Sequence, residues 1–125
     1  MHNVNGAAVY AWSEQPEDRP MPRIDRKRII GEQMMISQVL LHKGFAVATH
    51  SHANEQIAMV LSGRIRFGIG AAGSPEYSTV ELVGGQAIHL PSNVPHSAEA
   101  IEETLVLDLF SPTSATTGID QPHSR

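Results

Sequence analysis

Two histidines separated by one residue, His50 and His52, are the clearest candidates for chemistry in this 125-residue sequence. Side chains alternate between the two faces of a β-strand, so both imidazoles would point the same way. Gln56, four residues beyond His52, brings an amide oxygen close to them. Two nitrogens and one oxygen that converge suit a single divalent metal ion. Zn, Ni, Fe and Mn all accept such a mixed set, so the metal's identity stays open.

A second stretch, from Gly85 to His96, strengthens this interpretation. It fits the pattern G-x5-P-x-N-x2-H, and it places His96 after a Pro-containing turn. The first stretch, from Gly44 to Gly63, fits G-x5-H-x-H-x3-Q-x6-G. The histidine pair alone is a weak signal in a chain with seven histidines, but the joint spacing of the two stretches is specific.

The two stretches resemble the two motifs of the cupin superfamily, in the same order. That resemblance implies a jelly-roll β-barrel with a metal ion inside, and it implies four metal ligands: His50, His52, Gln56 and His96. The superfamily normally carries Glu where this chain has Gln56. Within the superfamily, the strings His-Ser-His-Ala-Asn-Glu-Gln-Ile and Leu-Asp-Leu-Phe-Ser-Pro are similar to the pectin-degradation cupins. Members of that subgroup linearise 4,5-unsaturated uronate monosaccharides to open-chain 5-keto uronates.

The same resemblance assigns residues to the substrate pocket. In the subgroup an Asp and a Phe of the last strand line the pocket, and here they are Asp108 and Phe110. Asp108 is the only polar residue in the apolar stretch 105–110. This favours a catalytic acid–base role over a structural one. The subgroup carries an arginine where this chain has Ser114. Arg64 and Arg66 share one strand face and would bind a substrate carboxylate in its place if that face points inward.

A ligand set of three imidazoles and one amide is neutral, so a bound metal would keep its full +2 charge. Such an ion is a strong Lewis acid and attracts an anionic substrate. This favours ring opening or isomerisation over dioxygen chemistry. Two alternatives stay open: another cupin metalloenzyme, such as a dioxygenase, lyase or cyclase, or a cupin that binds a metal or ligand without catalysis.

The elements that must position these residues are short strands. Turn signals separate them at intervals typical of an all-β sandwich or barrel, and no helix of ten or more residues is predicted. We expect an N-terminal segment with a short strand (residues 1–22), one barrel domain (23–112) and a flexible C-terminal tail (113–125). A single strand after residue 44 is expected to carry both His50 and His52.

Composition excludes several other functions. The net charge is −4, which offers no basic surface to nucleic acid, and there is no cysteine for a disulfide or a thiolate site. No signal-peptide pattern or membrane-spanning apolar run is seen, so a cytoplasmic protein without a membrane partner is expected. If Gln56 faces the barrel interior, then Ile57, Met59 and Leu61 face outward and favour a homodimer. The alternative is that residues 7–12 cover this row within one chain.

The remaining histidines and charged residues are expected to lie outside the metal site. His89 is expected to be structural or to support the site, and His2, His42 and His123 are expected to face solvent. Glu55 competes with Gln56 as a ligand but should face away from the site. Arg26 and Arg28 share a face of a predicted edge strand, where a solvated position is expected and an inward, substrate-facing arginine is the alternative.

Overall fold

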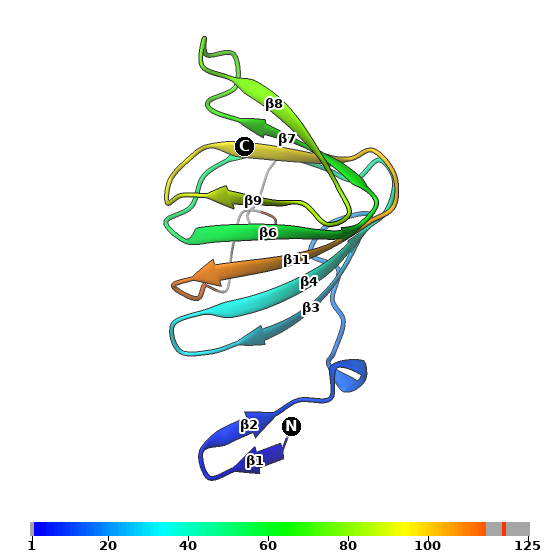
Figure 1. Ribbon diagram of the computed structural model, residues 1–125, viewed down its shortest axis with the longest axis vertical. Helices are drawn as coiled ribbons and strands as arrows, with labels where there is room; N and C mark the ends of the chain where they lie inside the picture. Colours follow the sequence, from blue (N-terminus) through cyan, green and yellow to red (C-terminus); the bar gives the residue numbers. More distant parts are fainter. Residues whose placement is uncertain (1, 115–118, 120–125) are drawn as a thin grey trace.

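Two antiparallel β-sheets enclose the core in this computed structural model, which describes residues 2–114 and residue 119 (Figure 1). The five-stranded sheet has the order β3-β4-β11-β6-β9, with bounds Ile24–Ile30, Met35–Leu41, Thr104–Ser111, Glu55–Ser62 and Ala87–Leu90. The four-stranded sheet has the order β5-β10-β7-β8, with bounds Ala46–His50, His96–Ala100, Arg64–Ile69 and Ser78–Val83. The predicted all-β barrel is confirmed.

Strict alternation of side chains builds the two inner faces. Along β4 every second residue, from Met35 to Leu41, is buried, and along β6 the buried residues are Gln56, Ala58 and Val60. Because antiparallel partners point to the same side of a sheet, these residues fill the space between the sheets. The fully buried hydrophobic cluster consists of Ile24, Val39, Leu41, Phe45, Val47, Ala58, Val60, Ile65, Phe67, Leu82, Leu90, Ala100 and Val106.

Two turns fix the strands that carry the motif residues. Gly63 joins β6 to β7 with φ of +94°, and a Cβ atom there would lie 2.3 Å from the carbonyl oxygen of Glu103. Only glycine combines this conformation with so close an approach. Asn93 precedes β10 with φ of 66°, a left-handed conformation that asparagine tolerates better than most residues. Its N–H donates to the carbonyl oxygen of His52 at 2.8 Å, which ties the two motif loops together.

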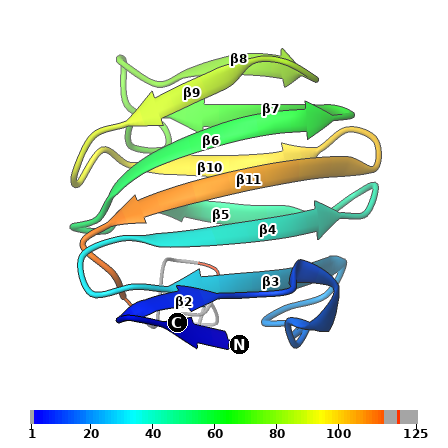
Figure 2. The same cartoon turned by 60° about the horizontal axis from the view of Figure 1, so that its bottom comes forward.

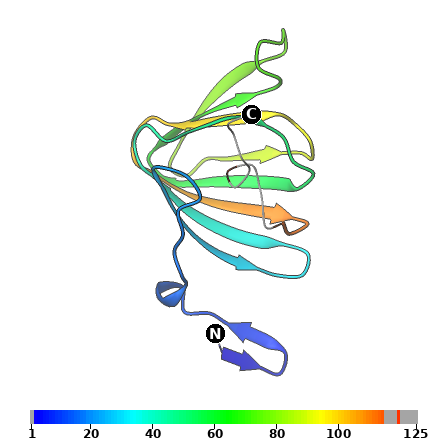
Figure 3. The same ribbon diagram turned by 180° about the vertical axis from the view of Figure 1, so that it is seen from behind.

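The N-terminal segment forms a hairpin that stands apart from the barrel. Strands β1 (His2–Val4) and β2 (Ala7–Val9) pair only with each other, and they lie beyond the β3 edge of the five-stranded sheet (Figures 1 and 3). A 3-10 turn, η1 (Trp12–Glu14), follows the hairpin. Within the described residues the hairpin does not cover the outward row of β6, because Ile57, Met59 and Leu61 remain 40%, 44% and 44% exposed.

One strand is shorter than predicted. Strand β5 ends at His50, so His52 lies in the loop that follows and not on the strand itself. No helix in the described part of the chain is long and apolar enough to cross a membrane. The predicted flexible tail lies outside the described residues except for residues 113, 114 and 119, and so does His123.

A candidate metal centre at one end of the barrel

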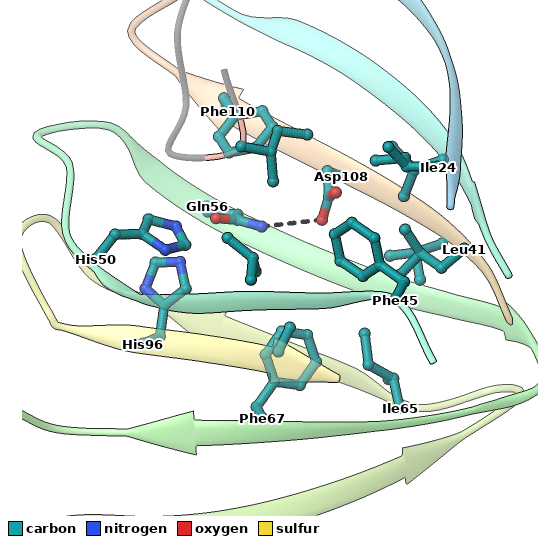
Figure 4. A pocket seen from close by; sticks show the side chains of 15 residues that line it. Ile24, Leu41, Phe45, His50, Gln56, Ile65, Phe67, His96, Asp108 and Phe110 are labelled. Atoms are coloured by element: carbon teal, nitrogen blue, oxygen red, sulfur yellow. Dashed lines mark hydrogen bonds between the residues drawn. The ribbon is translucent and has the colours of Figure 1, made fainter. Parts of the chain in front are cut away.

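His50 and His96 meet as partners on neighbouring strands. They lie directly opposite each other where β5 pairs with β10, so both side chains point to the same face of the four-stranded sheet. Their ring centroids are 4.5 Å apart, and Figure 4 shows both rings turned toward the barrel interior. The pairing of β5 with β10 thus places His50 of the first motif directly opposite His96 of the second motif.

His52 reaches the same place from the loop after β5. Its ring centroid lies 5.8 Å from that of His50 and 5.1 Å from that of His96. The backbone bond between Asn93 and His52 fixes this loop against the turn that leads into β10. One ring nitrogen from each of the three histidines lies within 4.8 Å of the others, so the three could hold a metal ion.

Backbone carbonyls set the tautomer of all three rings. The Nδ1 atoms of His50, His52 and His96 lie 2.8, 3.0 and 3.0 Å from the carbonyl oxygens of Ala48, Asn54 and Val94. A carbonyl can only accept, so each Nδ1 carries the proton and each Nε2 presents its lone pair. Metal-binding histidines are commonly oriented in this way, by a hydrogen bond from the ring nitrogen that does not bind the metal.

Gln56 approaches from the opposite sheet with its oxygen toward the histidines. Its amide Nε2 donates to Asp108 Oδ1 at 2.9 Å, which leaves Oε1 facing His52 Nε2 at 3.2 Å. Since His52 carries its proton on Nδ1, two lone pairs face each other across this gap. A cation between them turns an unfavourable contact into two ligand bonds. The donor set therefore fits a divalent metal ion held by three imidazoles and one amide oxygen.

His96 is the most buried of the three histidines. Desolvation, with a smaller contribution from the neighbouring His50 and His52, lowers its pKa to about 4, against the opposing effect of its hydrogen bond to Val94. At neutral pH its imidazole is therefore uncharged. A metal would not have to displace a proton from it.

His50 and His96 stand at one end of a largely apolar pocket inside the barrel (Figure 4). Gln56, Asp108 and Phe110 stand on the five-stranded sheet across from them, and Phe110 contacts the His52 ring edge-on with centroids 5.8 Å apart. The described lining residues are Ile24, Val39, Leu41, Phe45, Val47, His50, Gln56, Ile65, Phe67, His96, Ala98, Val106, Asp108, Phe110 and Ile119. Sequence reasoning did not anticipate Ile119, which comes from the C-terminal segment.

Asp108 points into this pocket, as predicted. It lies diagonally across from Gln56, because Asp108 pairs with Ala58 while Phe110 pairs with Gln56. Burial raises the pKa of the Asp108 carboxyl to about 7, even though the hydrogen bond from Gln56 acts in the opposite direction. Near neutral pH such a group exists in both protonation states, which suits a residue that accepts and returns a proton.

Arg64 and Arg66 lie outside the barrel, so the condition attached to their predicted role is not met. Ile65 and Phe67 occupy the inner face of β7, and the two arginine side chains are 44% and 42% exposed on the outer face. Both pair with Glu81, at 3.3 and 2.8 Å. Neither lines the pocket.

Arg26 is buried, in contrast to the solvated position expected from sequence. It shares the inner face of β3 with Ile24, and its side chain is only 2% exposed. Its Nε and Nη2 donate to Asp18 at 2.9 and 2.6 Å, and the backbones of the two residues form a β-bridge. The pair attaches the N-terminal segment to the free edge of β3. No sequence motif indicated this pair.

Glu55, His42 and His2 take the places expected of them, whereas His89 is exposed and does not support the site. Glu55 faces away from the site and meets the exposed His89 at 2.7 Å. His42 is half-exposed and bonds to Asp25 at 2.8 Å, and His2 is exposed.

Residues 37–110, which include all four predicted ligands, match the family described as "Cupin domain". The chain belongs to the cupin family. The two-sheet barrel is accordingly the cupin jelly roll. No curated protein matches the chain.

Solved cupin structures match it over most of its length. The structure of KdgF from Halomonas sp. superimposes with a TM-score of 0.76 at 26% sequence identity, covering 87% of this chain and 96% of that one. An RmlC-like cupin from Shewanella frigidimarina gives 0.77 at 17% identity, with 87% and 94% covered. The chain spans about a third of oxalate decarboxylase from Lactobacillus farciminis, with 92% and 36% covered, 15% identity and a TM-score of 0.77. The last two matches establish a shared fold only. The chain is a small cupin that resembles KdgF.

Proposed function

We propose that this cupin is a metal-dependent enzyme that opens the ring of a 4,5-unsaturated uronate or a related sugar acid. The observation that carries the proposal is the hydrogen bond between Gln56 and Asp108. It joins a group suited to hold a metal to a carboxyl whose pKa of about 7 suits proton transfer. His50 and His96 line the same pocket as this pair, and His52 lies 3.2 Å from the Gln56 amide oxygen.

The ring opening is an isomerisation, so every proton that leaves the substrate must be matched by one that returns. The bond between the anomeric carbon and the ring oxygen breaks, the anomeric hydroxyl loses its proton, and C4 gains one as the enol becomes a ketone. Asp108 is placed to carry that proton, because its carboxyl lines the pocket and is partly protonated near neutral pH. A bound divalent metal would supply positive charge to the substrate oxygens.

The rest of the pocket would orient the sugar and exclude water. Phe110 and the other apolar side chains of the lining present hydrophobic surface, while the polar lining residues are His50, His96, Gln56 and Asp108. No lysine or arginine is among the described lining residues. The neutral ligand set therefore matters, since it leaves a bound metal its full charge to attract a substrate carboxylate.

Two resemblances support this substrate class. The motif strings are similar to those of the pectin-degradation cupins, and Asp108 and Phe110 occupy the pocket positions that the resemblance implies. The match to the Halomonas KdgF structure extends over nearly the whole of that chain.

The test is spectroscopic. A free 4,5-unsaturated uronate absorbs ultraviolet light through its conjugated double bond, and ring opening removes that absorbance. Metal-loaded protein should bleach it faster than the spontaneous rate. No acceleration at millimolar substrate, with Fe, Ni, Mn and Zn each supplied, would reject the uronate.

A second candidate is another cupin metalloenzyme, such as a dioxygenase, lyase or cyclase. The absence of a cationic side chain among the described lining residues favours it, because a neutral substrate would also fit. Oxygen uptake with a small-molecule substrate would identify the dioxygenase. A protein that holds metal but turns over no substrate in a broad screen would instead be a metal- or ligand-binding cupin.

We also propose that the protein is a homodimer. The apolar row of Ile57, Met59 and Leu61 is exposed on the outer face of β6, as expected for a surface that binds a second chain.

A further inference from the structure

One row of side chains on the inner face of the five-stranded sheet is polar across three neighbouring strands. Strand β4 lies between β3 and β11 (Figure 2), and its Ser37 pairs with Arg28 on one side and with Asp108 on the other. Directly paired residues point to the same side of an antiparallel sheet, so the three side chains share one face. Ser37 is only 3% exposed and Asp108 lines the pocket, so this face is the barrel interior.

The small side chain of Ser37 leaves room between Arg28 and Asp108. The inward residues before and after it on β4 are Met35 and Val39, which are larger and apolar. The Cα atoms of Arg28 and Asp108 lie two strand spacings apart, which is about 10 Å. A long arginine side chain and a short aspartate side chain can both reach a small anion held between them.

In this structure the Arg28 guanidinium lies at the β3 edge, near Asp18. Its Nη2 is 3.7 Å from Asp18 Oδ2, whereas Arg26 donates two hydrogen bonds to the same carboxylate, at 2.9 and 2.6 Å. The contact of Asp18 with Arg28 is thus longer than a hydrogen bond, and Asp18 is held by Arg26. The Arg28 side chain is also more exposed, at 22% against 2% for Arg26. Arg28 is therefore the arginine of this pair that a ligand can reach.

The proposed substrate carries its negative charge next to the carbon that Asp108 would protonate. In a 4,5-unsaturated uronate the carboxylate is attached to C5, the direct neighbour of C4. A carboxylate that extends from C4 toward β6 would meet Ala58 and then Ile88 of β9, and neither can bind an anion. Toward β3 the row ends at Arg28, whose guanidinium can donate two parallel hydrogen bonds to a carboxylate.

We propose that Arg28 binds the carboxylate of the sugar-acid substrate by turning from Asp18 across Ser37 toward Asp108. This inference rests on the function proposed above and adds the residue that selects an acid over the corresponding neutral sugar. It gives Arg28 the inward, substrate-facing role that the sequence left as an alternative. The described lining of the pocket contains no arginine, and the rotation of this side chain brings one into it.

Sugar binding tests this role without catalysis. The probes are D-galacturonate and D-galactose, which lack the 4,5 double bond and differ only at C6. Calorimetric titration of the metal-loaded protein should show tighter binding of the acid. Arg28→Gln should weaken binding of the acid by about tenfold or more, with the affinity for galactose unchanged.

Lys27→Gln is the matched control, because it removes the same charge from the next residue of β3. The Lys27 side chain points to the opposite face of the strand, and its Nζ donates to the carbonyl oxygen of Trp12 at 3.1 Å. This variant should bind both sugars as the wild type does.

Two results would overturn the proposal. One is a wild-type protein that binds galacturonate no more tightly than galactose. The other is an Arg28→Gln variant that is folded by circular dichroism and keeps the wild-type affinity for the acid. If that variant does not fold, Arg28→Lys carries the test. Lysine keeps the charge but not the planar fork, so it should bind the acid at least about threefold less tightly, and an unchanged affinity overturns the proposal.

Kinetics separates this proposal from the ring opening itself. If the metal-loaded wild type bleaches the uronate, Arg28→Gln should raise KM by about tenfold and leave kcat nearly unchanged, because the contact is made equally in the ground state and the transition state. An unchanged KM overturns the role of Arg28 and leaves the ring opening intact. No bleaching by the wild type, together with binding of galacturonate that depends on Arg28, rejects the ring opening and supports the carboxylate site.

Discussion

Gln56 and Asp108 are joined by a hydrogen bond of 2.9 Å from the amide nitrogen to the carboxylate oxygen. This bond decides which end of the amide faces the histidines, because a carboxylate can only accept from the nitrogen. It also places the buried carboxyl one side chain away from the three imidazoles. In the proposed mechanism metal binding and proton transfer are therefore coupled through Gln56, and each can be tested separately.

The first prediction concerns metal content. Purified protein supplied with divalent ions should hold about one ion per chain, and the double variant His50→Ala/His52→Ala should hold less than about a tenth of that, because two of four ligands are gone. Elemental mass spectrometry measures both. His89→Ala is the control, since His89 is exposed and pairs with Glu55 away from the site. Equal metal in the double variant and the wild type would refute the ligand assignment.

The second prediction concerns Gln56→Glu. A carboxylate oxygen can replace the amide oxygen as a ligand, so metal should be retained. The new carboxyl would lie against Asp108, and two carboxyls in contact raise the pKa of one of them. The midpoint of the pH profile of kcat/KM should move to higher pH by roughly one unit. An unchanged midpoint would show that Asp108 does not govern the profile.

The third prediction concerns stability without metal. The pKa of Asp108 in the folded protein is raised to about 7, so between pH 4 and 7 the folded state binds more protons than the unfolded state. The stabilisation from this group is complete below about pH 4 and is lost as the pH rises through 7. Asp108→Asn removes the effect.

The chelator-treated Asp108→Asn variant should therefore gain stability relative to wild type as the pH rises from 4 to 7, with no further gain above that range. At about 1.4 kcal/mol per pKa unit the relative gain is a few kcal/mol at most. Calorimetry across this pH range measures it. The lowered pKa of His96 affects both proteins alike and cancels in the comparison. A difference that does not vary with pH would contradict the assigned pKa.

The fourth prediction concerns the outer arginines. Arg66→Gln should change KM by less than about twofold, because Arg66 lies on the outer face of β7 and pairs with Glu81. Exposed ion pairs contribute little to stability, so unfolding should also change little. Steady-state kinetics with the uronate measures KM. A large rise in KM would mean that Arg66 contacts the substrate, which contradicts its position on the outer face of β7.

The strands and the all-β class were predictable from local patterns in the sequence, whereas the jelly-roll topology was implied by the family resemblance. Period-two alternation in segments such as 64–69 and 104–111 identifies strands and shows which residues share a face. It does not show which of the two faces is inside. For β7 the face with Arg64 and Arg66 was the one predicted to bind substrate if it pointed inward. The opposite face, with the apolar side chains Ile65 and Phe67, is the one that is buried.

The site was predictable only in part, because its contacts cross between sheets. The spacing of His50, His52, Gln56 and His96 anticipated a cluster, but His52 joins it from a loop and not from the strand. The bond from Gln56 to Asp108 joins residues 52 positions apart, and no local pattern encodes it. The burial of Arg26 likewise depends on Asp18, whose position is fixed only when the N-terminal segment docks on β3.

The final prediction concerns catalysis by Asp108. Asp108→Asn keeps the shape of the side chain and its ability to accept the Gln56 hydrogen bond, but it removes the proton-transferring group. Turnover should fall by roughly two to four orders of magnitude, the usual effect of losing a positioned acid or base. Metal content and fold should be unchanged, since Asp108 is not among the expected ligands. Single-turnover bleaching of the uronate, with metal analysis and circular dichroism on the same preparation, measures all three. Normal turnover would remove Asp108 from the mechanism, and loss of metal or fold would assign it a structural role.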